Sequence, residues 1–188
     1  ISGGDRQALV INEIMYHPET SGQSEWVEIY NPNPQSVSLH GFEMTDGGSG
    51  NVFLFGEGAI IDSCGFLIVA GDAELFLSEF GSSVNLTGSF NKGISGFKLG
   101  NEGEALILLN SEGEQEDYVR YDDQAPWPVA ADGNGPSLQL IAPDMDNNYY
   151  SSWYASMEPK YTPGSINGGY STEEAPVTEE EALNIYPN

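Results

Sequence analysis

The feature that most restricts the fold of this chain is a series of short apolar runs separated by glycine and proline. Glycine occurs 23 times and proline 11 times in 188 residues, and both residues favour tight turns. Several runs alternate apolar and polar residues with a period of two, as strands with one buried face do. We therefore expect an all-β chain, an antiparallel sandwich or barrel. The expected strands are 8–16, 25–31, 36–45, 51–55, 65–71, 97–101, 104–110, 116–122 and 137–143.

One segment, 72–81, has a helical pattern instead. Leu75, Phe76 and Phe80 recur at helix spacing, Asp72 suits the N-cap, and a glycine follows as the stop. The sequence thus predicts one short helix near 72–81 in an otherwise β fold.

Two expected strands carry an acid within an apolar run. In EWVEIYN, Glu28 shares a face with the rings of Trp26 and Tyr30, and upstream Glu13 interrupts the run ALVINEIMY. Because a buried carboxylate is costly without partners, both acids are expected either at a solvated sheet edge or buried beside a group that compensates them.

The charge balance is strongly negative. The chain has 29 Asp and Glu against 5 Lys and Arg, a formal net charge of -24. Binding to nucleic acid depends on basic residues that displace counterions, so a nucleic-acid partner is not expected. The same charge repels an anionic membrane surface, and no run approaches the roughly 20 apolar residues of a membrane helix.

A divalent cation, a basic protein or a neutral glycan are partners that this surface tolerates. Plain solubility is an equally good explanation.

Residues for common catalytic chemistry are scarce. The chain has two histidines, His17 and His40, and one cysteine, Cys64, which stands in an apolar stretch and is expected to be a buried structural thiol. Serine-hydrolase and zinc chemistry require more than this. Paired carboxylates for glycoside hydrolysis are not excluded, because 29 acids supply many pairs.

Aromatic residues gather near the end of the apolar region. They are candidates for stacking against a glycan, although rings that seal one end of a sandwich explain them better. The candidate ligand-binding residues are Trp127, Tyr149, Tyr150, Trp153 and Tyr154.

A calcium loop is a further candidate. Asp144, Asp146 and Asn148 stand at every second position, as oxygen ligands do in calcium loops, but the glycine and glutamate that an EF-hand needs are absent. An Asp- and Asn-rich turn is the alternative. Glu13 and Glu28 are added as candidate cation ligands. No cofactor is expected to be required, and calcium is the one ion that we consider.

Several segments, in this order, resemble the bacterial branch of the lamin-tail domain family from about residue 8 to residue 167. They are LVINEIMYHP, SEWVEIYNPNPQSVSLHGFEMTDG, GFLIVAGD, NEGEALILLNSEGEQEDYVRYDD, PWPVAADGNGPSLQLIAPDMDNN, SSWYAS and YTPGSIN.

The resemblance implies an immunoglobulin-like antiparallel β-sandwich without catalytic activity. In bacteria such domains look like accessory modules of secreted or surface enzymes. The strands that hold Glu13 and Glu28 look like the first two of the sandwich and would pair. We therefore expect the two acids to be neutralised by Arg120 or by a bound cation.

The ends of the chain suggest a larger protein. We expect a leader at 1–7, a sandwich domain at 8–168, and an acidic linker at 169–188 that ends in NIYPN. This ending is similar to the start of the C-terminal sorting signal of type IX secretion, here truncated. The similarity implies secretion, or display at the outer-membrane surface of a Gram-negative bacterium.

These observations predict a non-enzymatic extracellular module of a larger multidomain protein. It would mediate attachment or contact with a protein at the cell surface. The alternative is a carbohydrate-binding module, assisted by calcium, whose partner is a glycan.

Overall fold

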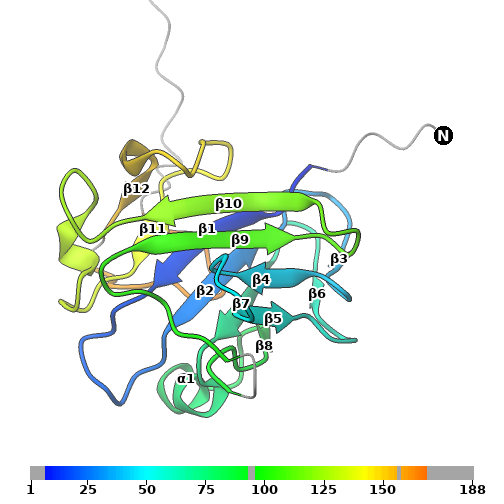
Figure 1. Cartoon of the computed structure of the whole chain (residues 1–188), viewed down its shortest axis with the longest axis horizontal. Coiled ribbons are helices and arrows are strands. Elements are labelled where there is room, and N and C mark those ends of the chain that lie inside the picture. Colours follow the sequence, from blue (N-terminus) through cyan, green and yellow to red (C-terminus); the bar gives the residue numbers. More distant parts are fainter. Residues whose placement is uncertain (1–6, 93–95, 156–157, 169–188) are drawn as a thin grey trace, which may run out of the picture.

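Two β-sheets pack face to face in the computed structural model, which describes residues 7–92, 96–155 and 158–168 (Figure 1). The larger sheet has the strand order β12-β11-β1-β2-β7-β8. Its neighbouring strands are antiparallel except β7 and β8, which are parallel. The strands of this sheet are β1 (Val10–Met15), β2 (Trp26–Tyr30), β7 (Phe66–Ala70), β8 (Leu86–Thr87), β11 (Leu138–Leu140) and β12 (Trp153–Tyr154).

The second sheet has four antiparallel strands in the order β10-β9-β4-β5. A separate two-stranded ribbon joins β3 to β6. The bounds are β3 (Val37–Ser38), β4 (Glu43–Thr45), β5 (Val52–Leu54), β6 (Ile60–Ile61), β9 (Glu104–Leu109) and β10 (Gln115–Tyr121). Two 3-10 turns, Val129–Ala131 and Tyr150–Ser152, and one helix complete the described elements. The all-β sandwich predicted from the sequence is confirmed.

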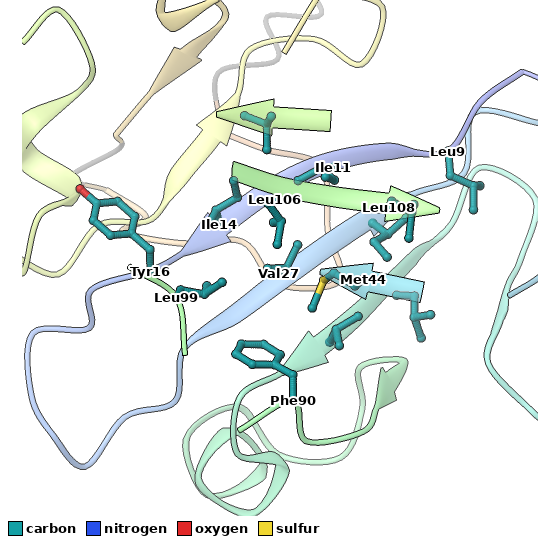
Figure 2. Packing of buried hydrophobic residues seen from close by; sticks show 14 of the residues in the cluster. Leu9, Ile11, Ile14, Tyr16, Val27, Met44, Phe90, Leu99, Leu106 and Leu108 are labelled. Atoms are coloured by element: carbon teal, nitrogen blue, oxygen red, sulfur yellow. The ribbon is translucent and has the colours of Figure 1, made fainter. Parts of the chain in front are cut away.

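The main core lies between the two sheets. Ile14 of β1 and Val27 of β2 face Leu106 of β9 and Met44 of β4, and all four are almost fully buried (Figure 2). Core residues alternate in β2, at Val27 and Ile29, and in β9, at Leu106 and Leu108, so the period of two in these runs reflects the shared interior.

A second apolar cluster covers the outer face of the larger sheet. Helix α1 (Ala73–Phe80) lies over it, and Phe76 packs edge-on against Trp26 of β2 at 6.0 Å between ring centroids. Asp72 caps the helix by accepting hydrogen bonds from the amides of Glu74 and Leu75. The predicted helix is therefore confirmed, and it buries part of the outer face of the larger sheet.

Two predicted strands differ from the structure. The run 36–45 is interrupted by a turn in which the Phe42 amide donates to the Leu39 carbonyl, so it forms β3 and β4. The run 97–101 forms no strand, although Leu99 is buried. The alternation of apolar residues in this run comes from a partly buried loop. The Leu99 amide donates to the carboxylate of Glu25 and not to a neighbouring strand.

The expectation of a buried Cys64 is wrong. Cys64 is exposed and has a φ of 51°, in a turn closed by the Gly65 amide and the Asp62 carbonyl. The left-handed backbone turns the thiol outward from an apolar stretch. Within the described residues, no helix has the length and apolar character needed to cross a membrane.

Gly103 is a point at which the fold tolerates no side chain. Its φ is +91°, and a Cβ there would lie 2.6 Å from the carbonyl oxygen of Tyr121 and 2.7 Å from the Cα of Asp122. Gly113 has a similar φ of +79° but open space around it. We expect Gly113→Ala to lower the free energy of unfolding by about 1–2 kcal/mol through its backbone conformation. Gly103→Ala should cost about 1–3 kcal/mol more through overpacking. Urea unfolding of both variants tests this, and equal losses would contradict the tight approach.

Candidate functional site

Glu13 and Glu28 are directly opposite each other on β1 and β2. Both side chains are fully buried. They lie on the outer face of the larger sheet, since their neighbours Val27 and Ile29 belong to the core between the sheets. The pairing predicted for the two acids is confirmed.

Glu13 is bound by donors from two distant parts of the chain. Its Oε1 accepts from Ser137 Oγ at 2.5 Å, from Gln139 Nε2 at 3.1 Å and from the Thr162 amide at 2.9 Å. Its Oε2 accepts from Thr162 Oγ1 at 2.9 Å. The carboxylate thus joins β1, β11 and the segment near residue 162.

Glu28 has fewer donors. Its Oε1 accepts from Asn12 Nδ2 at 2.6 Å, and its Oε2 accepts from the Gly164 amide at 2.7 Å. Asn167 completes the network, because its amide donates to the carbonyls of Asn12 and Leu140. The segment that we call the C-terminal strap, residues 160–168, is therefore held onto the sheet by the two acids and this asparagine.

The prediction of Arg120 as counter-ion of the pair is wrong, and the alternative of a bound cation stays a prediction. Arg120 is exposed on β10, in the other sheet, and no hydrogen bond to either acid comes from it. Burial raises the pKa of Glu13 despite its four donors. Burial and then the charge of Glu13 raise the pKa of Glu28 well above its usual value. Protonation of Glu28 is therefore favoured relative to an isolated glutamate, and it would relieve the repulsion between the two acids.

The predicted calcium residues lie in an exposed loop after β11. Asp144, Asp146 and Asn148 are exposed, whereas Asn147 between them is buried and donates to Asp117 Oδ2 at 2.7 Å. Asp146 Oδ1 accepts from the Asn148 amide at 3.0 Å, a local turn contact. In the described part of the chain, no group of three or more His, Cys, Asp and Glu side chains is arranged to hold a metal ion.

The predicted ligand-binding rings fall into two sets. Trp153 is buried, donates from Nε1 to the Asn147 carbonyl at 2.7 Å, and packs 6.3 Å from the half-buried Trp127. The Tyr154 hydroxyl donates to Gln139. Tyr149 and Tyr150 are 61% and 47% exposed and remain accessible. Only this pair has the exposure that stacking against a sugar requires.

A polar cavity lies between the β1–β2 loop, the start of α1 and the chain near residue 98. Its volume is about 400 Å³. Three carboxylates reach it, those of Glu19, Glu25 and Asp72. The other lining residues are His17, Pro18, Thr20, Ser21, Gln23, Ser24, Leu75, Asn91, Lys98 and Asn101.

The three carboxylates of the cavity differ in their partners. Glu19 pairs with Lys160 at 3.0 Å, and Asp72 pairs with Lys92 at 3.2 Å while it caps α1. Glu25 accepts a hydrogen bond from the Leu99 amide at 2.9 Å, and burial raises its pKa. The sequence did not single out this cavity, because its walls come from three segments that no local pattern connects.

A comparison with protein families identifies the family of this chain. The model of the Lamin Tail Domain family matches residues 4–123, more than half of the 188-residue chain. The chain belongs to the lamin tail domain family. Its two sheets form the immunoglobulin-like β-sandwich of that family. A comparison with curated proteins finds no match.

The lamin tail fold of this chain continues past the matched residues. β11 pairs with β1 and β12 pairs with β11, both beyond residue 123, and the strap supplies donors to Glu13 and Glu28. The described residues after 123 are thus an integral part of the sandwich. The predicted linker and sorting signal at 169–188 lie outside the described residues.

The pair of acids predicts a pH dependence of stability. The folded-state pKa of Glu28 is raised above its unfolded value, so the native state binds the proton more tightly. This contribution to stability is complete below the unfolded pKa of about 4.3 and is lost as pH rises through the folded pKa. Glu28→Gln, which cannot ionise, should therefore lose less stability than the wild type between pH 5 and pH 8.

Urea unfolding at pH 5, 6, 7 and 8 measures this difference. A change of one pKa unit between folded and unfolded states corresponds to about 1.4 kcal/mol. The free energy of unfolding of the wild type should therefore fall relative to that of Glu28→Gln as the pH rises. Glu57→Gln, at an exposed turn, removes the same charge and should run parallel to the wild type. Parallel curves for Glu28→Gln would show that the acid ionises normally.

Proposed function

We propose that this lamin tail domain is a non-catalytic accessory module of a larger secreted protein. In this role it mediates attachment or protein–protein contact at the cell surface. Lamin tail domains are in general non-enzymatic.

The proposal places the protein outside the cell or on the outer-membrane surface of a Gram-negative bacterium, exported through type IX secretion. The sequence similarity of NIYPN to a sorting signal supports that location. Nucleic acid and membrane insertion have no part in the proposal.

The observation that carries the proposal is that the carboxylates of the chain have different partners. The buried carboxylates of Glu13 and Glu28 and the half-buried carboxylate of Asp117 each accept hydrogen bonds from the fold itself. Among the described residues that line the polar cavity, Glu25 is the one carboxylate without an ion pair to a side chain. Glycoside hydrolysis needs two cooperating carboxyl groups. Because two of the three carboxylates of the cavity are held in ion pairs, the arrangement supports binding in preference to catalysis.

The negative charge of the chain supports a basic protein as the partner. A formal net charge of -24 attracts positively charged surfaces and repels acidic ones. Complementary charge of this kind raises the rate of encounter and favours the correct partner. No cofactor enters this proposal.

A carbohydrate-binding module assisted by calcium is the second candidate. Tyr149 and Tyr150 favour it, since both rings are exposed and follow directly after the loop that carries Asp144, Asp146 and Asn148. Burial of Trp153 makes the available aromatic surface smaller than the sequence suggested.

Sedimentation with cell envelopes separates the two candidates. The full 188-residue chain is mixed with envelopes of a Gram-negative bacterium that uses type IX secretion. The envelopes are either untreated, digested with protease or oxidised with periodate. A protein partner predicts that co-sedimentation is lost after protease and kept after periodate and in EDTA. The reverse pattern would favour the glycan candidate, and no co-sedimentation with untreated envelopes would contradict attachment.

A further inference from the structure

We infer that the polar cavity beside α1 is a binding site for the guanidinium group of an arginine side chain presented by a basic partner. This inference rests on the proposed protein-binding function and names the chemistry of the partner. Glu25 is the central residue, and Asn91 and Asn101 line the same cavity.

The carboxylate of Glu25 is poised to accept further hydrogen bonds. It lies in the cavity wall and uses Oε2 to accept from the Leu99 amide. His17 and Lys98 are close enough to favour its charged form, but His17 Nδ1 is already 2.6 Å from Asp132 Oδ1. Lys98 is exposed and lies outside ion-pair distance of Glu25. A carboxylate so placed gains more from an incoming cation than one that is already paired.

The remaining carboxylates do not compete for that cation. Glu19 and Asp72 are paired with Lys160 and Lys92, whereas Glu25 is in no ion pair and has Lys98 as a more distant positive charge in the same cavity. This separation distinguishes the cavity from the general acidity of the surface, which is spread over exposed turns.

The rest of the wall matches an arginine side chain. A guanidinium group offers five N–H donors in a planar fork and is never deprotonated in proteins. The amide oxygens of Asn91 and Asn101 can accept from the edges that Glu25 does not reach, while Leu75 and Pro18 offer apolar contact to the aliphatic stem. A volume of about 400 Å³ lies within the size range of ligand pockets and leaves room for bridging water.

Titration with a small arginine probe tests the assignment. N-acetyl-arginine amide is added to the 15N-labelled full chain, and its citrulline counterpart, which has the same shape without the charge, is the control ligand. We expect the arginine probe to shift the amide resonance of Leu99, whose N–H donates to Glu25. Citrulline should shift it at least tenfold more weakly. Equal shifts from both ligands, or shifts confined to other surfaces, would overturn the inference.

Variants identify the carboxylate responsible. Glu25→Gln keeps an oxygen that can accept from Leu99, so the fold should survive, and a thermal melt verifies this. The variant should bind the arginine probe at least tenfold more weakly, whereas Glu57→Gln should bind as the wild type does. Retained binding by Glu25→Gln would refute the site.

The envelope experiment separates this inference from the proposed function. If the wild type and Glu25→Gln bind envelopes equally and binding is sensitive to protease, the cavity is not the contact and the inference fails, while the proposed function stands. If the wild type does not bind envelopes, the proposed function fails on its own account. Selective loss of envelope binding in Glu25→Gln would support both.

Discussion

The fold depends on two buried carboxylates that join the beginning of the chain to its end. Glu13 and Glu28 stand opposite each other in the first two strands, and their oxygens receive the amides of Thr162 and Gly164 in the strap. Removing such an acceptor would leave buried donors unsatisfied, at a cost of about 1–3 kcal/mol for each group. The acids that look misplaced in an apolar strand are therefore the reason why the final segment covers the outer face of the sheet.

The same pair explains how an extremely acidic chain can bury acids at all. The described structure provides neutral hydrogen-bond donors to both acids, and burial beside a second acid raises the pKa of Glu28, which favours its protonated form. The few lysines are used at the surface, where Lys92 and Lys160 pair with Asp72 and Glu19. Glu25 is left as the acid of the cavity that an external cation can compensate.

Local patterns predicted the local structure well. The helix followed from residues within one segment, Asp72 through Phe80, and the β-sandwich followed from alternation and turns. Leu99 misled the prediction, because an apolar residue in a buried loop repeats like one in a strand. The donors to Glu13 lie more than 120 residues away in the chain, and the cavity combines three segments, so neither leaves a trace in any short stretch of sequence.

Hydrogen exchange at two amides tests most directly whether the carboxylates hold the strap. The account predicts that the amides of Thr162 and Gly164, which donate to Glu13 and Glu28, exchange as slowly as those of β1 and β2. The amide of Ile166, whose side chain is 64% exposed in the same segment, provides the reference for fast exchange. Exchange of Thr162 and Gly164 as fast as Ile166 would contradict the anchoring of the strap by the buried acids.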